Sequence, residues 1–125
     1  MHTVLIIEDD SAVIQLVERM LERAGYESLA VQNLYEVEER IQEFGGISVV
    51  LADVFFPEGT SIKTVRALKK LFPRAGVVLM SGYPVEQALG DDAPMDPDWI
   101  FLQKPFSLPD LLRSIKQQLP EPELT

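Results

Sequence analysis

The stretch VVLADVFFPEG, residues 49–59, places a charged side chain in a run that is otherwise typical of a protein interior. From Ile47 to Ala52 the only polar residue is Ser48, which indicates a buried strand. Asp53 follows at once, and three apolar residues come after it. Because a buried carboxylate without partners is strongly unfavourable, the position of Asp53 predicts that it has partners or a chemical role.

The composition indicates one domain with a hydrophobic core. The chain has 125 residues, 46% of them hydrophobic, and no apolar run approaches the roughly 20 residues that span a bilayer. There is no cysteine, which excludes disulfides and thiolate zinc sites. The first residues lack the basic start of a signal peptide, so we expect a cytoplasmic location. The net charge of −9 disfavours direct contact with nucleic acids or anionic membranes.

Apolar segments alternate with amphipathic helical patterns along the whole chain. The expected strands are Thr3–Ile7, Glu27–Val31, Ile47–Ala52, Val77–Met80 and Trp99–Leu102. The expected helices follow caps at Asp10 or Ser11, at Asn33 and at Ser107, and cover residues 11–24, 34–44, 62–72, 85–89 and 108–119. This alternation predicts one α/β domain over residues 1–119, with a parallel sheet and helices on both faces. Residues 120–125 form a polar Pro/Glu tail or linker.

Apolar spacing also predicts which side of the first helix faces the core. The predicted buried stripe is Val13, Leu16, Val17, Met20 and Leu21. After Asp53, residues 54–59 are predicted to form a loop that leads to the third helix.

Polar residues follow four of the predicted strands. Glu8 and Asp9 follow the first strand, Asp53 the third, Ser81 the fourth, and Lys104 comes just after the fifth. The carboxyl ends of parallel strands meet at one edge of a sheet, and open α/β sheets bind their ligands there. We therefore expect these five side chains to converge on one site.

The convergence of three carboxylates indicates cation chemistry. At ~4 Å and an effective dielectric constant near 20, each pair of carboxylates repels by about 4 kcal/mol. Either the pKa values rise or a cation binds, and carboxylate ligands with open positions suit Mg²⁺. Lys104 adds a compact positive charge and Ser81 a hydroxyl donor. Together these groups are suited to covalent phosphoryl transfer to Asp53.

Four stretches in this order, VLIIEDD (4–10), VVLADVFFP (49–57), VVLMSGY (77–83) and FLQKPFS (101–107), resemble the receiver domains of two-component response regulators. The resemblance covers about residues 3–119. Within the family, the chain is similar to receivers of hybrid sensor kinases and to single-domain regulators. It implies the flavodoxin-like receiver fold, a five-stranded parallel sheet of order 2-1-3-4-5, numbered along the chain.

The resemblance implies a role for each acidic residue. Asp53 matches the phosphoacceptor, which receives a phosphoryl group from a histidine kinase or a histidine phosphotransfer protein. Asp9 and Asp53 match ligands of Mg²⁺ (or Mn²⁺), and Glu8 matches a ligand that acts through water. Phe55 matches the position whose backbone carbonyl binds the metal.

The resemblance also implies how phosphorylation is read. Ser81 matches the switch hydroxyl, Phe101 the aromatic switch position and Lys104 the lysine of the site, with a cis Lys104–Pro105 bond. Phosphorylation would change the surface made by the helix 85–89, the strand 99–102 and the last helix. The expected protein is a signalling switch, not an enzyme in its own right, with an unknown output partner.

Around the site, this chain departs from the family pattern in two respects. Ser61 stands where many members have glycine, and Phe55 and Tyr83 place aromatic rings at the rim of the site, where they could keep water from the phosphoryl group.

Two alternatives remain open at this point. One is a degenerate receiver that only binds partner proteins. The other is an Asp-nucleophile phosphatase of the haloacid dehalogenase type, which needs a second Asp where this chain has Phe55. The sequence does not identify the cognate kinase, the pathway, the oligomeric state or any further domain.

Overall fold

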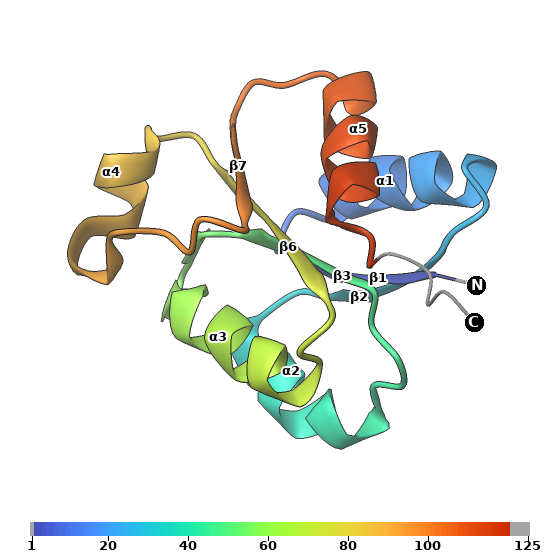
Figure 1. The fold of residues 1–125 in the computed structure, drawn as a ribbon, viewed down its shortest axis with the longest axis horizontal. Helices are drawn as coiled ribbons and strands as arrows, with labels where there is room; N and C mark the ends of the chain where they lie inside the picture. Colours follow the sequence, from blue (N-terminus) through green and yellow to red (C-terminus); the bar gives the residue numbers. More distant parts are fainter. Residues whose placement is uncertain (1, 121–125) are drawn as a thin grey trace.

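Five parallel strands form the central sheet, in the order β2-β1-β3-β6-β7 (Figure 1). The computed structural model describes residues 2–120, so the predicted tail lies, apart from Pro120, outside the described residues. The strands are β1 (Thr3–Ile7), β2 (Glu27–Val31), β3 (Val49–Asp53), β6 (Gly76–Ser81) and β7 (Ile100–Gln103). Because β6 and β7 are the fourth and fifth strands of the sheet along the chain, the predicted order 2-1-3-4-5 is confirmed.

The helices cover both faces of this sheet. Figure 1 shows α1 and α5 on one side and α2 and α3 on the other. The helices are α1 (Ser11–Arg23), α2 (Leu34–Arg40), α3 (Ile62–Leu71), α4 (Val85–Leu89) and α5 (Leu108–Gln118), with short 3₁₀ helices at Ile41–Glu43 and Gly90–Asp92. No helix of the described residues is long and apolar enough to cross a membrane.

The apolar run before Asp53 is explained by burial on both faces. In β3, Val50 and Ala52 belong to the core under α2 and α3, whereas Val49 and Leu51 belong to the core under α1 and α5. A strand covered on both sides needs apolar residues at every position, so it lacks the alternation of a half-exposed strand.

Side-chain caps start three of the helices where the sequence predicts them. The Asp10 carboxylate accepts a hydrogen bond from the Ala12 amide at 2.9 Å, which selects Asp10 over Ser11 as the first cap. The Asn33 side chain accepts from the Glu36 amide at 2.7 Å, and the Ser107 hydroxyl from the Asp110 amide at 3.1 Å. These bonds satisfy amides that have no partner inside the helix.

The predicted loop after Asp53 is partly wrong. Phe55–Phe56 (β4) and Gly59–Thr60 (β5) pair as a small antiparallel hairpin outside the main sheet. Gly59 has a φ of +130°, a conformation that side chains with a Cβ rarely adopt. The hairpin holds the segment after Asp53 in a fixed path.

The predicted stripe of α1 is also partly wrong. Leu16 is 52% exposed, whereas Ile14, which the prediction left out, is buried together with Val17 and Leu21. The spacing of three and four residues from Ile14 through Val17 to Leu21 defines the side that meets the sheet. Leu16 lies off this stripe on the solvent side.

The predicted helix at residues 34–44 is shorter in the structure. It ends as an α-helix at Arg40 and continues as a 3₁₀ turn, Ile41–Glu43. Ion pairs from the Arg40 guanidinium to Glu36 at 3.0 Å and Glu43 at 3.1 Å span this change.

Gly76, at the start of β6, is the glycine with the closest neighbour. A Cβ at this position would overlap the backbone of Gln118 at the end of α5. The Gln118 side chain also accepts from the Val77 amide at 2.9 Å and donates to the Asp98 carbonyl at 2.8 Å. The end of α5 is therefore seated directly on the sheet.

We expect Gly76→Ala to lower the free energy of unfolding by about 1–3 kcal/mol, because α5 must move away from β6. The matched control is Gly46→Ala, since no atom lies within 4 Å of a Cβ there. Urea denaturation of both variants measures the effect. Equal stability of the two variants would contradict the close seating of α5.

Candidate functional site

Three carboxylates converge at the carboxyl edge of the sheet. Glu8 and Asp9 follow β1, and Asp53 is the last residue of the neighbouring β3. One oxygen from each lies within 4.8 Å of the others. The parallel pairing of β1 with β3 brings them together, since both strands end at the same level.

Lys104, which follows β7 at the same edge of the sheet, contacts this group. Its ammonium lies 2.9 Å from Asp53 Oδ2 and 3.8 Å from Glu8 Oε2. Burial alone would lower the pKa of Lys104, but the hydrogen bond and the charge of Asp53 outweigh it and raise that pKa. Lys104 is therefore a permanent cation in the site.

Glu8 has the least favourable surroundings for a charge. It is 1% exposed; its Oε1 accepts from the Asp10 amide at 3.1 Å, and its Oε2 has no hydrogen-bond partner among the described residues. Burial raises the pKa of Glu8 to about 7, and the nearby Asp53 charge adds to the rise. The Asp10 amide and the Lys104 charge act in the opposite direction without cancelling it.

Ser61 positions the backbone around Asp53. Its hydroxyl donates to the Asp53 carbonyl at 2.6 Å, and its amide donates to the Val54 carbonyl at 2.9 Å. Ser61 is fully buried, and α3 starts at the next residue. In the sequence this residue stands out only as a departure from a family glycine, and nothing there indicates that its hydroxyl reaches the backbone of Asp53.

Ser81 and Lys104 are linked through the backbone. The Ser81 carbonyl accepts from the Lys104 amide at 2.7 Å, and the Ser81 hydroxyl accepts from the Tyr83 amide at 3.1 Å. The Lys104–Pro105 bond is cis, as the resemblance implied, and the Ala93–Pro94 bond, for which no prediction was made, is cis as well. Ser81 itself is fully buried.

The rings of Phe55 and Tyr83 contact each other. They meet edge to face, with centroids 5.5 Å apart and planes at 79°, and both side chains are about half exposed. The Phe55 amide is 3.4 Å from Asp53 Oδ1, which places this pair beside the carboxylate. Phe101 lies elsewhere, on β7 in register with Leu79, half-buried against the core.

The family model of the response regulator receiver domain matches residues 4–116. The chain belongs to this family. Receiver domains are signalling modules of two-component systems, they interact with histidine kinases or phosphotransfer proteins, and they bind Mg²⁺ through acidic residues. The Glu8, Asp9 and Asp53 group of this receiver domain provides such residues.

This receiver domain matches two relatives from Brucella abortus (strain 2308), and the share of each relative's length that it covers is very different. It is 36% identical to the sensor kinase CckA over 118 residues, which are 94% of this chain but only 12% of CckA. It is 31% identical over 119 residues to the response regulator receiver protein CpdR, covering 95% of this chain and 98% of CpdR. The match therefore includes both a segment of a large kinase and a nearly whole small protein.

Solved structures agree on the fold. The receiver domain of the hybrid histidine kinase CckA superposes with a TM-score of 0.76 at 26% identity, covering 94% of this chain and 98% of that one. A response regulator receiver protein from Sinorhizobium medicae WSM419 reaches a TM-score of 0.81 at 24% identity, covering 94% and 93% of the two chains.

Without Mg²⁺, we expect Glu8 to make the protein less stable as the pH rises from about 5 to about 8. The pKa of Glu8 is about 7 in the folded state against 4.5 ordinarily, so the folded protein binds an extra proton in this window. The extra proton on Glu8 contributes roughly 3 kcal/mol to the free energy of unfolding at low pH. This contribution falls as the pH rises through the window and is lost once the pH has passed about 7.

Urea denaturation at several pH values with a chelator measures this loss. The control is Glu8→Gln, which mimics the neutral carboxyl and removes the contribution of this group. Identical pH dependence in the wild type and in Glu8→Gln would show that Glu8 does not titrate in this range.

Proposed function

We propose that this chain is a phosphorylation-dependent switch that accepts a phosphoryl group on Asp53 from a histidine kinase or a histidine phosphotransfer protein. The observation that carries the proposal is the contact of the Lys104 ammonium with Asp53 Oδ2, at 2.9 Å, beside the carboxylates of Glu8 and Asp9. A nucleophilic carboxylate, an ammonium and further metal-binding oxygens are the groups that phosphoryl transfer requires.

The donor set fits Mg²⁺ or Mn²⁺. Asp9 and Asp53 would hold the ion directly, Glu8 through water, and Phe55 through its backbone carbonyl. Glu8 Oε2, buried without a hydrogen-bond partner, supports this assignment because a cation or its water would satisfy it. The bound ion would offset negative charge on the transferred oxygens.

The chemical step is a transfer between two nucleophiles. An Asp53 carboxylate oxygen attacks the phosphorus of a phosphohistidine, the N–P bond breaks and an acyl phosphate O–P bond forms. The imidazole leaves as a neutral group after taking a proton from solvent. Lys104, already bonded to the Asp53 carboxylate, then stabilises the phosphoryl oxygens as a fixed positive charge.

The readout follows from the charge that the phosphoryl group adds, about −1.5 to −2. The Ser81 hydroxyl leaves the Tyr83 amide and donates to a phosphoryl oxygen, and its carbonyl carries the shift to the Lys104 amide. Phe101 then changes its position on β7. These changes bias the surface made by α4, β7 and α5 between two states.

The phosphatase alternative lacks an acid/base residue. The residue two positions after Asp53 is Phe55, whose side chain can neither donate nor accept a proton. The degenerate-receiver alternative predicts no response to phosphoryl donors, and the experiment below separates it from the proposal.

Acetyl phosphate with Mg²⁺ is expected to add the mass of one phosphoryl group to the wild type and none to Asp53→Asn, as measured by intact mass spectrometry.

Beryllofluoride with Mg²⁺ is expected to change the fluorescence of Trp99, the only tryptophan of the sequence. Trp99 is 7% exposed and belongs to the core that includes Ala88 and Leu89 of α4. The proposal fails if wild type and Asp53→Asn respond alike. Sustained hydrolysis of p-nitrophenyl phosphate would favour the phosphatase instead.

Slow dephosphorylation is expected because the Phe55 and Tyr83 rings lie beside Asp53 and offer no group that orients water. Phe55→Asn combined with Tyr83→Glu should speed the loss of the phosphoryl group by about tenfold, or about 1.4 kcal/mol in the barrier. Decay of the phosphorylated mass after removal of the donor gives the rate.

The control is Tyr35→Glu, which changes an aromatic ring on α2 that is 62% exposed and that, among the described residues, forms no ring contact with Phe55 or Tyr83. It should decay like the wild type. An unchanged rate in the double variant would show that the aromatic pair does not restrict water.

A further inference from the structure

Strand β2 forms one open edge of the sheet, and among the described residues 2–120 its only neighbouring strand is β1. The Glu27 amide donates to the His2 carbonyl at 2.9 Å, and the Val31 carbonyl accepts from the Glu8 amide at 3.1 Å, so the backbone groups of these positions face β1. Because backbone groups alternate in direction along a strand, those of Ser28 and Ala30 point to the open edge. They can pair with a further strand.

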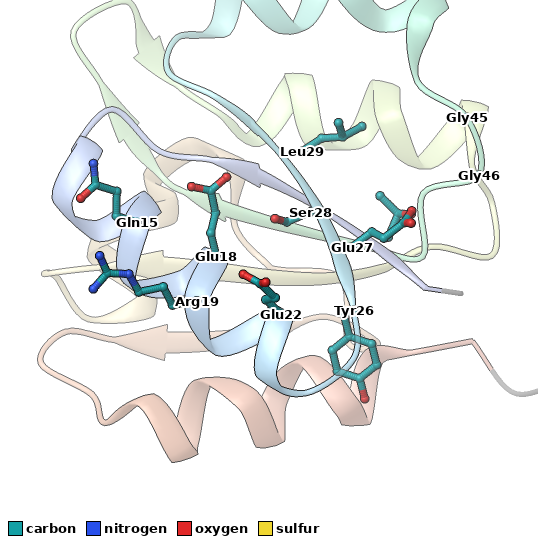
Figure 2. A pocket seen from close by; sticks show the side chains of 11 residues that line it. Gln15, Glu18, Arg19, Glu22, Tyr26, Glu27, Ser28, Leu29, Gly45 and Gly46 are labelled. Atoms are coloured by element: carbon teal, nitrogen blue, oxygen red, sulfur yellow. The ribbon is translucent and has the colours of Figure 1, made fainter.

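A groove of about 780 Å³ lies beside the first half of this strand, against Glu27, Ser28 and Leu29. Figure 2 shows α1 on one side of β2 and the Gly45–Gly46 segment on the other. An added Cβ at either glycine would meet no atom within 4 Å, so there is free space next to the Gly45–Gly46 side of the groove. The groove therefore gives an extended chain access to the edge of β2.

The groove is acidic. Glu18 and Glu22 extend from α1 on the side of β2, and Glu27 lies at the start of the strand (Figure 2). None of the three forms an ion pair within the described part of the chain, so their charges are available to a ligand. Arg19 is the basic residue of the lining.

We infer that this groove binds an extended, Lys/Arg-rich segment of another protein, which adds a strand to the edge of β2. The edge groups of Ser28 and Ala30 would supply the backbone hydrogen bonds. The carboxylates of Glu18 and Glu22, on the α1 face, would pair with basic side chains at alternate positions of the segment, and Glu27 with a basic side chain that points to the other face. Five residues of strand span about 16 Å, so a segment of this length follows the whole of β2.

Charge selects this occupant over a second copy of the chain. Edge-to-edge pairing of two β2 strands would bring both sets of glutamates together in a protein of net charge −9. Like charges on facing strands are destabilising, whereas a basic strand would neutralise them.

The groove is also separate from the phosphoacceptor. Thr3, Glu27, Gly45 and Gly46 of its lining lie at or before the amino ends of the strands, whereas Asp53 ends β3 at the carboxyl edge. Binding at β2 therefore does not require phosphorylation, and failure of one proposal leaves the other intact.

The probe is a capped peptide of eight residues that alternates lysine and threonine, titrated into the full ¹⁵N-labelled chain at low salt. We expect the largest NMR shifts at the amides of Ser28 and Ala30. The same peptide N-methylated at alternate residues keeps its charge but cannot complete the strand pairing, and it should bind at least tenfold more weakly. Equal binding of both peptides, or shifts centred on Asp9 and Asp53, would overturn the proposal.

A pair of matched variants tests the role of the carboxylates. Glu18→Gln with Glu22→Gln should weaken binding of the lysine peptide by roughly threefold to tenfold. Glu38→Gln with Glu39→Gln removes the same two charges from exposed positions of α2 outside the groove and should leave the affinity unchanged. An equal loss in both double variants would mean that the peptide responds only to the net charge of the protein.

Discussion

The contact of the Lys104 ammonium with Asp53, at 2.9 Å, is the interaction on which the site depends. Glu8, Asp9 and Asp53 bring three acidic groups within 4.8 Å, and one ammonium compensates only one of their charges. The fold forces this arrangement, because β1 and β3 are parallel neighbours that end at the same level. The remaining negative charge can be neutralised by a proton on Glu8 or by a divalent cation. The raised pKa of Glu8 corresponds to the first of these.

Most of the fold could be predicted because the helices and main strands carry strong periodic signals. The doubly covered β3 and the caps at Asp10 and Asn33 are examples in which local sequence and tertiary structure agree. The β4–β5 hairpin could not be predicted, because two-residue strands show no periodicity. For α1, two overlapping apolar stripes fit the sequence, and only contact with the sheet decides that Ile14 is buried and Leu16 exposed.

The site was predictable as a set of residues but not as a network. Parallel strand order predicts that Glu8, Asp53 and Lys104 meet, and the structure brings them together. The bonds of Ser61 to the Asp53 carbonyl and of Ser81 to the Tyr83 amide depend on side-chain rotamers and loop paths, which tertiary packing determines. A family glycine replaced by serine carries no sequence signal that its hydroxyl has a buried partner.

The placement of fixed and movable groups suggests a direction for the signal. The carboxylates lie at the ends of β1 and β3, and the hydrogen bond from the Ser61 hydroxyl anchors the Asp53 backbone to the start of α3. Ser81 is the last residue of β6, and Lys104 follows β7. A hydrogen bond of 2.7 Å from the Lys104 amide to the Ser81 carbonyl joins them. Under the proposed function, a phosphoryl group on Asp53 would therefore attract Ser81 and Lys104, on the β6–β7 side of the sheet next to α4 and α5. The edge of β2 lies at the other end of the sheet order, so under the proposed switch a partner bound there would stay bound in both states.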